Sequence, residues 1–245
     1  MGVDVNLNEA IEIRRSRRKY DPTPIDPEIV DSLQQLIVRY SQEAGVRMEL
    51  VLDNGAAFEG FRRSYGMFAG VRHYVGLIAD DRDPVSAEKL GYYGELLLLH
   101  AVTMGLAGCW VAGTYDKKAC PFVLSEHERL AIVLVLGNAS QDPSGKEKLI
   151  YNLIHRKTKG IEEMYTADTD VPDWFIAAME AVKRAPSAIN RQPVKFSYKE
   201  GKIRARVEGR PDDMLALDFG IAKCHFALGA GKGTWAWGNH AEFSY

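Results

Sequence analysis

The densest group of chemically active side chains is a basic cluster near the N-terminus, RRSRRKY at residues 14–20. Its first six positions hold five cations, with the hydroxyl of Ser16 between them. Guanidinium groups bind phosphate oxygens in pairs, and a hydroxyl donates a further hydrogen bond. The cluster predicts a site for a phosphate monoester, although a solvated basic turn explains the same residues taken alone. A second basic group, at residues 155–159, fits a surface charge run when considered by itself.

The second candidate is a loop at residues 185–193 with the sequence APSAINRQP. Its two prolines restrict the backbone, and its serine, asparagine and glutamine side chains can donate and accept hydrogen bonds. Such a loop suits the edge of a planar heterocycle. A well-formed turn without a ligand is the alternative interpretation.

The third candidate is the stretch GLAGCWVAG at residues 105–113. Its small residues let the backbone approach a flat ligand closely, although a glycine-rich helix end has the same composition. The chain lacks both a G-x-G-x-x-G fingerprint after a strand and a Walker A lysine, which excludes Rossmann and P-loop sites.

The sequence contains no pattern for nucleophilic or metal chemistry. It has no G-x-S-x-G motif, and its six histidines show no metal-ligand spacing. Its three cysteines form neither a disulfide framework nor a zinc pattern. We therefore expect no catalytic side chain and no metal, and we expect His100 and His225 to be buried core residues.

Hydrophobic periodicity predicts alternating helices and strands. Asp26 and Pro27 form a helix start, and Ser125 and Glu128 form a capping pair ahead of a short helical turn. The expected helices are at 8–13, from 27, at 89–104, 172–184 and 215–229. The expected strands are at 48–52, 74–78, 130–136, 194–198 and 203–207.

Two parts of the chain look alike. Gly94-x6-Ala101 and Gly220-x6-Ala227 lie in similar apolar helices, and each helix runs into a glycine-rich turn with tryptophan, CWVAG or TWAWG. We expect two units, residues 1–166 and 167–245, related by duplication. Shared composition without common ancestry is the alternative.

Charge and hydropathy argue against a nucleic-acid-binding, secreted or membrane-spanning protein. The 245 residues include 31 Lys and Arg against 33 Asp and Glu, a net charge of −2, which argues against a nucleic-acid partner. No signal peptide is visible, and the most apolar stretch, residues 96–112, falls short of a membrane helix. We expect a soluble cytoplasmic protein with no membrane partner.

Taken together, the motifs resemble those of the nitroreductase family of FMN-dependent flavoproteins. The family's Arg-Arg-Ser-x-Arg-x-aromatic motif stands here at 14–20, and its A-P-S-A-x-N-x-Q-P loop stands at 185–193 without a mismatch. GLAGCW at 105–110 matches the end of the family's buried helix. The segment from Arg156 to Glu163 matches its closing motif.

The order of the motifs departs from the family pattern. The A-P-S-A loop usually follows the Arg-Arg-Ser motif within a few dozen residues, but YSQEAG at 40–45 stands there and has lost its proline, asparagine and glutamine. In the family, the flavin lies at a homodimer interface and takes the two motifs from different subunits. The resemblance therefore implies a nitroreductase-like α+β fold of two related α/β halves. Each half has a β-sheet flanked by helices, and the chain is a fused pseudo-dimer with one complete flavin site and one degenerate site.

The resemblance also assigns roles to residues. Arg14, Arg15 and Ser16 would hold phosphate and ribityl oxygens of FMN. Arg156 would join the phosphate group, and Arg18 would lie near the pyrimidine edge of the flavin. The remaining flavin-binding residues implied are Trp110, Val111, Ala112 and Gly113 from the first half, and Pro186, Ser187, Ala188, Asn190 and Gln192 from the second.

The implied activity is NAD(P)H-dependent, ping-pong, two-electron reduction of a small-molecule acceptor such as a nitroaromatic or a quinone. Two alternatives remain open at this point. One is another enzyme on the same scaffold, such as a dehalogenase, an enoate reductase or a flavin-fragmenting enzyme, and the other is a non-catalytic FMN-binding or storage module. We expect a monomer with one FMN between its halves.

Overall fold

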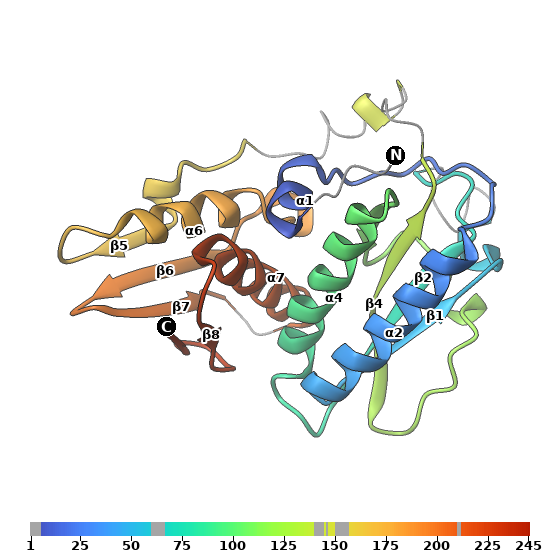
Figure 1. Cartoon of the computed structure of the whole chain (residues 1–245). Helices are drawn as coiled ribbons and strands as arrows, with labels where there is room; N and C mark the ends of the chain where they lie inside the picture. The colour runs from blue at the N-terminus through green and yellow to red at the C-terminus, as the bar shows by residue number, and fades with distance from the viewer. Residues whose placement is uncertain (1–5, 60–66, 140–144, 146, 150–156, 210–211) are drawn as a thin grey trace.

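The computed structural model describes residues 6–59, 67–139, 145, 147–149, 157–209 and 212–245. These residues form two lobes, each built from helices packed on one antiparallel or mostly antiparallel sheet (Figure 1). No helix in these ranges is long and apolar enough to cross a membrane.

The first lobe contains a four-stranded sheet in the order β1-β2-β4-β3, with every neighbouring pair antiparallel. The helix α2 begins as expected, because Asp26 accepts a hydrogen bond from the Glu28 N–H and Pro27 occupies the first helical position. It ends at Gly45, whose φ of 64° is left-handed. The elements are α1 (Leu7–Ile13), α2 (Pro27–Ala44), β1 (Arg47–Val51), β2 (His73–Asp80), α4 (Ser86–Thr103), β3 (Ala107–Val111) and β4 (Glu128–Gly137), with short 3-10 turns at Ala56–Phe58 and Lys117–Ala119.

The second lobe contains a five-stranded sheet in the order β5-β6-β7-β9-β8. The expected hairpin around Glu200 and Gly201 is present as β6 and β7, and β5 adds to its edge in parallel. The elements are β5 (Tyr165–Ala167), α6 (Asp173–Lys183), β6 (Val194–Lys199), β7 (Lys202–Val207), α7 (Asp213–Ala230), β8 (Thr234–Trp235) and β9 (Glu242–Ser244), with 3-10 turns at Ile161–Glu163 and Ala188–Asn190.

The two lobes repeat one topology. The series α2, β1, β2, α4, β3, β4 is matched in order by α6, β6, β7, α7, β8, β9, and the strands occur in the same spatial order in both sheets. The expected α+β class, with two related halves, is confirmed. The expected boundary between residues 166 and 167 falls within β5, a strand of the second sheet.

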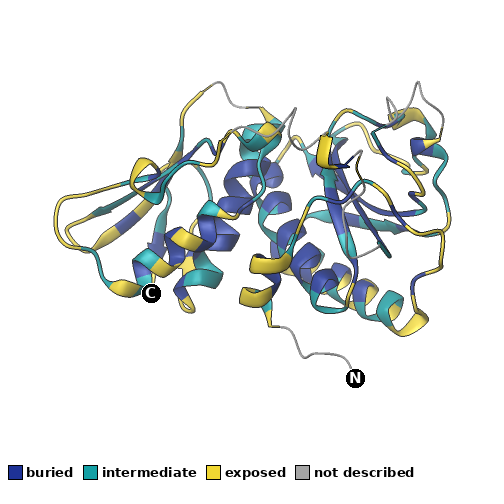
Figure 2. Ribbon diagram, turned by 90° about the horizontal axis from the view of Figure 1, so that it is seen from above, coloured by how far each residue is buried: buried dark blue, intermediate teal, exposed yellow. Residues whose placement is uncertain are grey.

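The helices α4 and α7 pack against each other at the centre of the molecule, where both are largely buried (Figure 2). A Cβ atom added to Gly91 would lie 2.2 Å from the Leu217 carbonyl oxygen, and one added to Gly220 would lie 1.9 Å from that of Glu88. The two contacts are equivalent, because Leu217 lies three residues before Gly220 and Glu88 lies three residues before Gly91. Gly91 and Gly220 are therefore the corresponding positions of the two helices. The alignment expected from the sequence instead paired Gly94 with Gly220, an offset of three residues.

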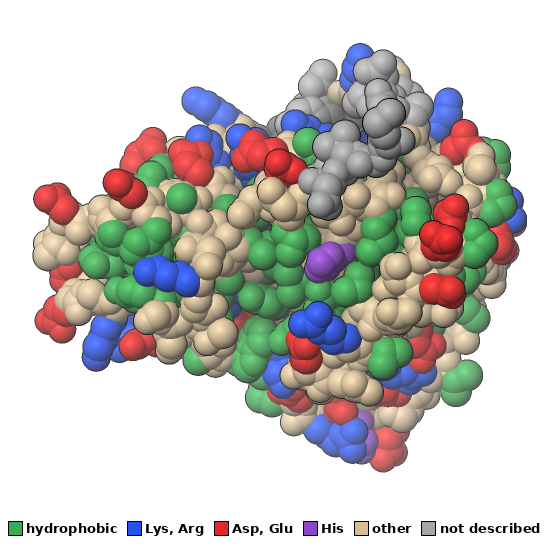
Figure 3. Space-filling model, in the orientation of Figure 1, with side chains coloured by type: hydrophobic (Ala, Val, Ile, Leu, Met, Phe, Trp, Pro, Cys, Tyr) green, Lys and Arg blue, Asp and Glu red, His purple; other side chains and the backbone are tan. Residues whose placement is uncertain are grey.

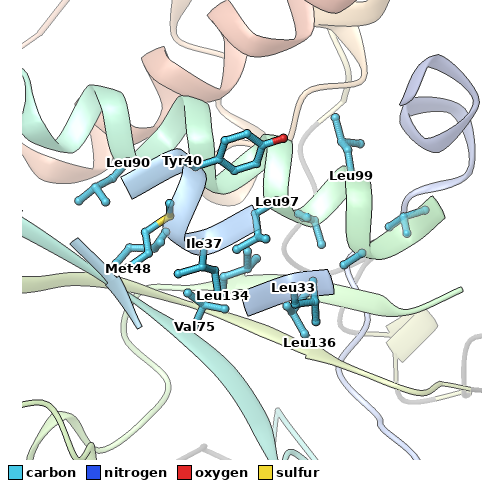
Figure 4. Close-up of a cluster of buried hydrophobic side chains, with 14 of the residues drawn as sticks. Leu33, Ile37, Tyr40, Met48, Val75, Leu90, Leu97, Leu99, Leu134 and Leu136 are labelled. Carbon is cyan, nitrogen blue, oxygen red and sulfur yellow. The ribbon is translucent and has the colours of Figure 1, made fainter. Parts of the chain in front are cut away.

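The core of the first lobe lies between its sheet and the helices α2 and α4. Leu33 and Ile37 of α2, Leu97 of α4, and Val75 and Leu134 of the sheet all belong to this cluster (Figure 4). The helix α4 is apolar on nearly every face because it packs on the sheet, on α2 and on α7. A separate aromatic-rich cluster fills the second lobe.

Two local expectations were wrong. The stretch CWVAG was expected to be a turn, but most of it belongs to β3, which pairs with β4 from Ala107 to Val111. Glu128 accepts a hydrogen bond from the Ser125 N–H at 2.9 Å, yet it opens the strand β4 instead of a helical turn. The β-branched residues that follow Glu128 favour a strand, and their pairing on both sides overrides the local cap signal.

Candidate functional site

The basic cluster is an extended segment beside β3. Ser16 forms a parallel bridge with Gly108, and the Arg17 N–H donates to the Gly108 carbonyl at 3.1 Å. Arg17 and Tyr20 are buried, so the interpretation as a solvated turn is wrong. The segment extends the first sheet at its β3 edge, and this pairing fixes the backbone that carries the cations.

The cations of the cluster have different surroundings. The Arg17 Nε lies 3.1 Å from Glu147 Oε1, which also accepts the N–H groups of Arg18 at 2.7 Å and Lys19 at 3.2 Å. The exposed Arg15 donates to two backbone carbonyls of its own segment. Glu147 therefore holds the middle of the cluster, and Arg17 has a structural role.

Arg14 differs from its neighbours because its guanidinium is buried without a hydrogen bond. Its side chain is 9% exposed, and its Nε lies 3.6 Å from Glu95 Oε1, beyond hydrogen-bond distance. Within the described residues, its Nε and Nη1 atoms have no acceptor. A buried cation that lacks acceptors is unfavourable, and an anionic ligand would remove that penalty.

Glu95 of α4 is fully buried and connects the two lobes. Its Oε2 accepts the indole N–H of Trp110 at 2.7 Å, and its Oε1 lies 3.0 Å from His225 Nε2 of α7. Burial alone raises the pKa of Glu95, but His225, Arg14 and Trp110 outweigh it and the net pKa is lowered. We refer to Arg14, Glu95, Trp110 and His225 as the Glu95 cluster.

The loop at 185–193 belongs to the second lobe and has an unusual backbone. Ile189, Asn190 and Gln192 have φ values of 47°, 52° and 47°, a left-handed conformation unfavourable by about 1–2 kcal/mol per non-glycine residue. Concentrated backbone strain of this kind is typical of ligand-binding segments. The Ser187 hydroxyl accepts the Gln192 N–H at 2.9 Å and closes the loop on itself.

Gln192 holds the loop in place, because both ends of its side-chain amide form hydrogen bonds with the protein. The Oε1 atom accepts the Lys159 N–H at 2.9 Å, and the Nε2 atom donates to the Lys183 carbonyl at 3.3 Å. Asn190 Nδ2 donates to Thr158 Oγ1 at 3.3 Å. The loop is thus tied both to α6 and to the segment that precedes β5.

The buried carboxylate of Asp218, on α7, is hydrogen-bonded to the loop. It accepts the Ala188 N–H at 3.1 Å and 3.2 Å, one distance to each oxygen. Burial raises its pKa to about 7, although the Ala188 N–H and Arg191 act in the opposite direction. A cavity of about 10 Å³ lies between Asp218, Pro186 and the end of α6, which is room for about one water molecule.

The end of α1 is linked to the start of the loop at 185–193. The α1 helix lies between α6 and α4 (Figure 1), and Glu12 at its end pairs with Arg184 at 2.6 Å, next to the loop. His225 Nδ1 lies 2.9 Å from the Ala181 carbonyl on α6, so Arg14 is linked through Glu95 and His225 to the helix that carries the loop.

The remaining expected residues are placed as follows. Val111 is buried in the hydrophobic core, whereas Ala112 is half-buried and Gly113 is exposed. Pro186, Ser187, Ala188 and Asn190 are half-buried, as are Ser16 and Arg18. Arg156 lies outside the described residues. Among the described residues, no cluster of histidine, cysteine and carboxylate side chains could hold a metal ion.

Sequence reasoning missed Glu95 and Asp218 and treated His225 only as a core residue. His225 is indeed fully buried and hydrogen-bonded, but its partner is the carboxylate beside Arg14. One signal was available in the sequence. Glu95 and Asp218 stand among apolar and glycine residues in largely apolar helices, and a buried acid requires a partner.

A family model described as "Putative TM nitroreductase" matches residues 6–230 of this chain. A solved protein from Thermotoga maritima described as a "putative nitroreductase" is 19% identical, with a TM-score of 0.68 over 99% of this chain and 94% of that chain. At this identity the likeness shows the fold.

Smaller solved proteins are similar over part of the chain. An FMN-dependent nitroreductase from Clostridium difficile is 17% identical, with a TM-score of 0.44 over 60% of this chain and 96% of that chain. A "putative NADH oxidase" from Clostridium acetobutylicum is 17% identical, with a TM-score of 0.41 over 56% and 89%. No curated protein matches the chain.

Proposed function

The chain belongs to the nitroreductase family whose model matches residues 6–230. From that membership we propose that the protein is a flavin oxidoreductase. The proposed cofactor is FMN, bound noncovalently between the two halves, with NAD(P)H as the reductant. The proposed acceptors are small molecules such as nitroaromatics and quinones. Bound FMN would supply the hydride chemistry, and the protein would supply binding, orientation and electrostatics.

The observation that carries the proposal is the buried guanidinium of Arg14, which lies 3.6 Å from Glu95 but makes no hydrogen bond through its Nε or Nη1 with any described residue. Among the described residues its Nε and Nη1 lack acceptors, and a phosphate or ribityl oxygen would complete them. Arg15 and Ser16 lie on the same extended segment and would add donors. Arg18 would lie near the pyrimidine edge, and Arg156 would join the phosphate group.

The loop at 185–193 would close the site from the second half. Hydrogen bonds of Ala188 with Asp218, and of Gln192 with Lys159 and Lys183, hold the loop in place. Pro186, Ser187, Ala188 and Asn190 would contact the flavin, and Gln192 would hold the loop that presents them. The backbone from Trp110 to Gly113 would approach its ring from the first half.

We propose one FMN for each chain. The equivalent of the loop is missing from the first half, where α2 ends at Ala44 and β1 begins at Arg47. Three aromatic rings pack together near the end of α2. The ring centroid of Tyr93 lies 5.5 Å from that of Tyr40 and 6.2 Å from that of Trp237. Figure 3 shows hydrophobic side chains gathered over this junction of α4 and α7. Aromatic packing therefore occupies the elements that would form a second site.

A test of the proposed function is the visible spectrum of the purified protein, with the ratio of FMN to chain and the mass of the complex. We expect one FMN bound to a monomer, and oxidation of NADH or NADPH when a quinone is added. Two FMN molecules per chain, or a complex that loses flavin on dilution to the monomer, would contradict the stoichiometry. Flavin binding without turnover would favour the storage module over the enzyme.

The phosphate assignment has a separate test. Charge-assisted hydrogen bonds contribute about 1.5–3 kcal/mol, so Arg14→Ala should weaken FMN binding by about tenfold to a hundredfold. The matched control is Arg39→Ala, which removes an exposed guanidinium that pairs with Glu43 one turn further along α2. Unchanged FMN affinity in Arg14→Ala would show that the assignment is wrong.

A further inference from the structure

Glu95 is the most deeply buried acid near the proposed flavin site, with 0% of its side chain exposed. It lies on α4 among leucines and glycines, where an unpaired carboxylate would be strongly destabilising. Both of its oxygens have partners: Trp110 donates to one, and His225 lies against the other. Residues from both halves therefore converge on this carboxylate.

The hydrogen bonds of His225 show how the cluster is arranged. A backbone carbonyl only accepts hydrogen bonds, so the Nδ1 atom that faces the Ala181 carbonyl at 2.9 Å carries a proton. With Glu95 ionised, the Nε2 atom at 3.0 Å donates as well. In that state each carboxylate oxygen of Glu95 accepts one strong hydrogen bond, Oε2 from Trp110 and Oε1 from His225.

These two hydrogen bonds have a consequence for Arg14. At 3.6 Å from Glu95 Oε1, the Arg14 Nε feels the charge of the carboxylate but makes no hydrogen bond with it. The guanidinium is held in place by charge and burial, while its N–H groups stay available for another acceptor. A carboxylate without these two donors would be a stronger acceptor and would compete for those N–H groups.

We propose that Glu95, held by His225 and Trp110, is a positioning residue that presents the Arg14 guanidinium to the phosphate of FMN. This inference rests on the proposed function. Since His225 belongs to α7 and Glu95 to α4, contact between the two halves would fix the cation that binds the phosphate. The site would then form only when the halves are packed together.

The test compares FMN with riboflavin, which lacks the phosphate. Flavin-free protein is titrated with each ligand, and the dissociation constants come from quenching of flavin fluorescence. We expect Arg14→Ala and Glu95→Gln each to reduce the preference for FMN over riboflavin by about tenfold. We also expect Arg14→Ala to reduce it by less than about threefold further in the Glu95→Gln background, because a misplaced guanidinium no longer contributes.

The matched control is Glu88→Gln, which neutralises another buried carboxylate on α4 that pairs with Lys223 of α7. It should lower the melting temperature without changing the preference for FMN. A merely structural Glu95 would behave in the same way, and that result for Glu95→Gln would overturn the proposal. An undiminished effect of Arg14→Ala in the Glu95→Gln background would also overturn it.

A second variant covers the case in which Glu95→Gln does not fold. Trp110→Phe keeps an aromatic ring at this position but removes the N–H donor to Glu95 Oε2. With one donor fewer, Glu95 becomes a stronger acceptor, which should draw Arg14 toward it and lower the FMN preference by threefold or more, and an unchanged preference would contradict the proposal. A wild-type protein that binds neither ligand would instead refute the proposed function, and this inference with it.

Discussion

Asp218→Asn is expected to gain stability relative to the wild type as the pH rises from 5 to 8. Asp218 is 3% exposed and accepts only the Ala188 N–H among the hydrogen bonds described. Burial raises its pKa to about 7, with Asp212 adding to the rise and the Ala188 N–H and Arg191 opposing it, from 3.8 in the unfolded chain. The folded protein therefore keeps this proton over a range in which the unfolded chain has released it.

The sign and size of the effect follow from proton linkage. The folded state binds the extra proton between about pH 4 and pH 7, so the free energy of unfolding falls as the pH rises through that window. The contribution of Asp218 is fully present below the unfolded pKa and is lost once the pH passes about 7. One pKa unit corresponds to about 1.4 kcal/mol, so the two units from pH 5 to 7 amount to about 3 kcal/mol.

Asparagine retains an oxygen that can accept the Ala188 N–H and cannot ionise. The free energy of unfolding is measured by urea denaturation with tryptophan fluorescence at pH 5, 6, 7 and 8. The difference between Asp218→Asn and the wild type should rise by about 3 kcal/mol across this series. Comparing the change with pH removes any constant penalty from the new amide N–H groups.

The matched control is Asp31→Asn, which alters an exposed carboxylate on α2. Its stability should run parallel to that of the wild type. Parallel curves for Asp218→Asn as well would refute the reasoning, because they would mean that Asp218 ionises at the same pH in the folded and unfolded states.

Three further changes have expected outcomes. Gly220→Ala places a Cβ 1.9 Å from the Glu88 carbonyl oxygen, so we expect overpacking of about 1–3 kcal/mol or more and a melting temperature lower by several degrees in calorimetry. Lys223→Met leaves Glu88 buried without its cation, which should lower the free energy of unfolding by about 3–5 kcal/mol in denaturant titrations. If the double variant Glu88→Gln, Lys223→Met recovers part of that loss, the unpaired charge of Glu88 is the cause. Asn190→Ala loses the hydrogen bond to Thr158 at a left-handed position, so it should lower the melting temperature modestly and weaken FMN binding, and equal affinity would remove Asn190 from the proposed site.

The sequence alone determined the helices and the longer strands, and the structure added the short strands β3, β5, β8 and β9. Local signals were sufficient for most elements, since the cap at Asp26, the turn at Glu200 and Gly201, and the β-branched run in β4 depend on near neighbours. The same signals failed for β3 and for Ser125, where pairing with a distant strand decided the conformation. The motifs also identified the basic segment and the loop at 185–193 as candidates, because their residue types are unusual in adjacent positions.

Only the tertiary structure decided which of these residues meet. Arg14, Trp110 and His225 are far apart in the chain, and they converge because Gly91 and Gly220 let α4 and α7 approach with their backbones in contact. The structure also separated the role of Arg17, which pairs with Glu147, from that of Arg14, which is buried without an acceptor. Burial and hydrogen-bond saturation depend on every neighbour in space, and no window of sequence contains that information.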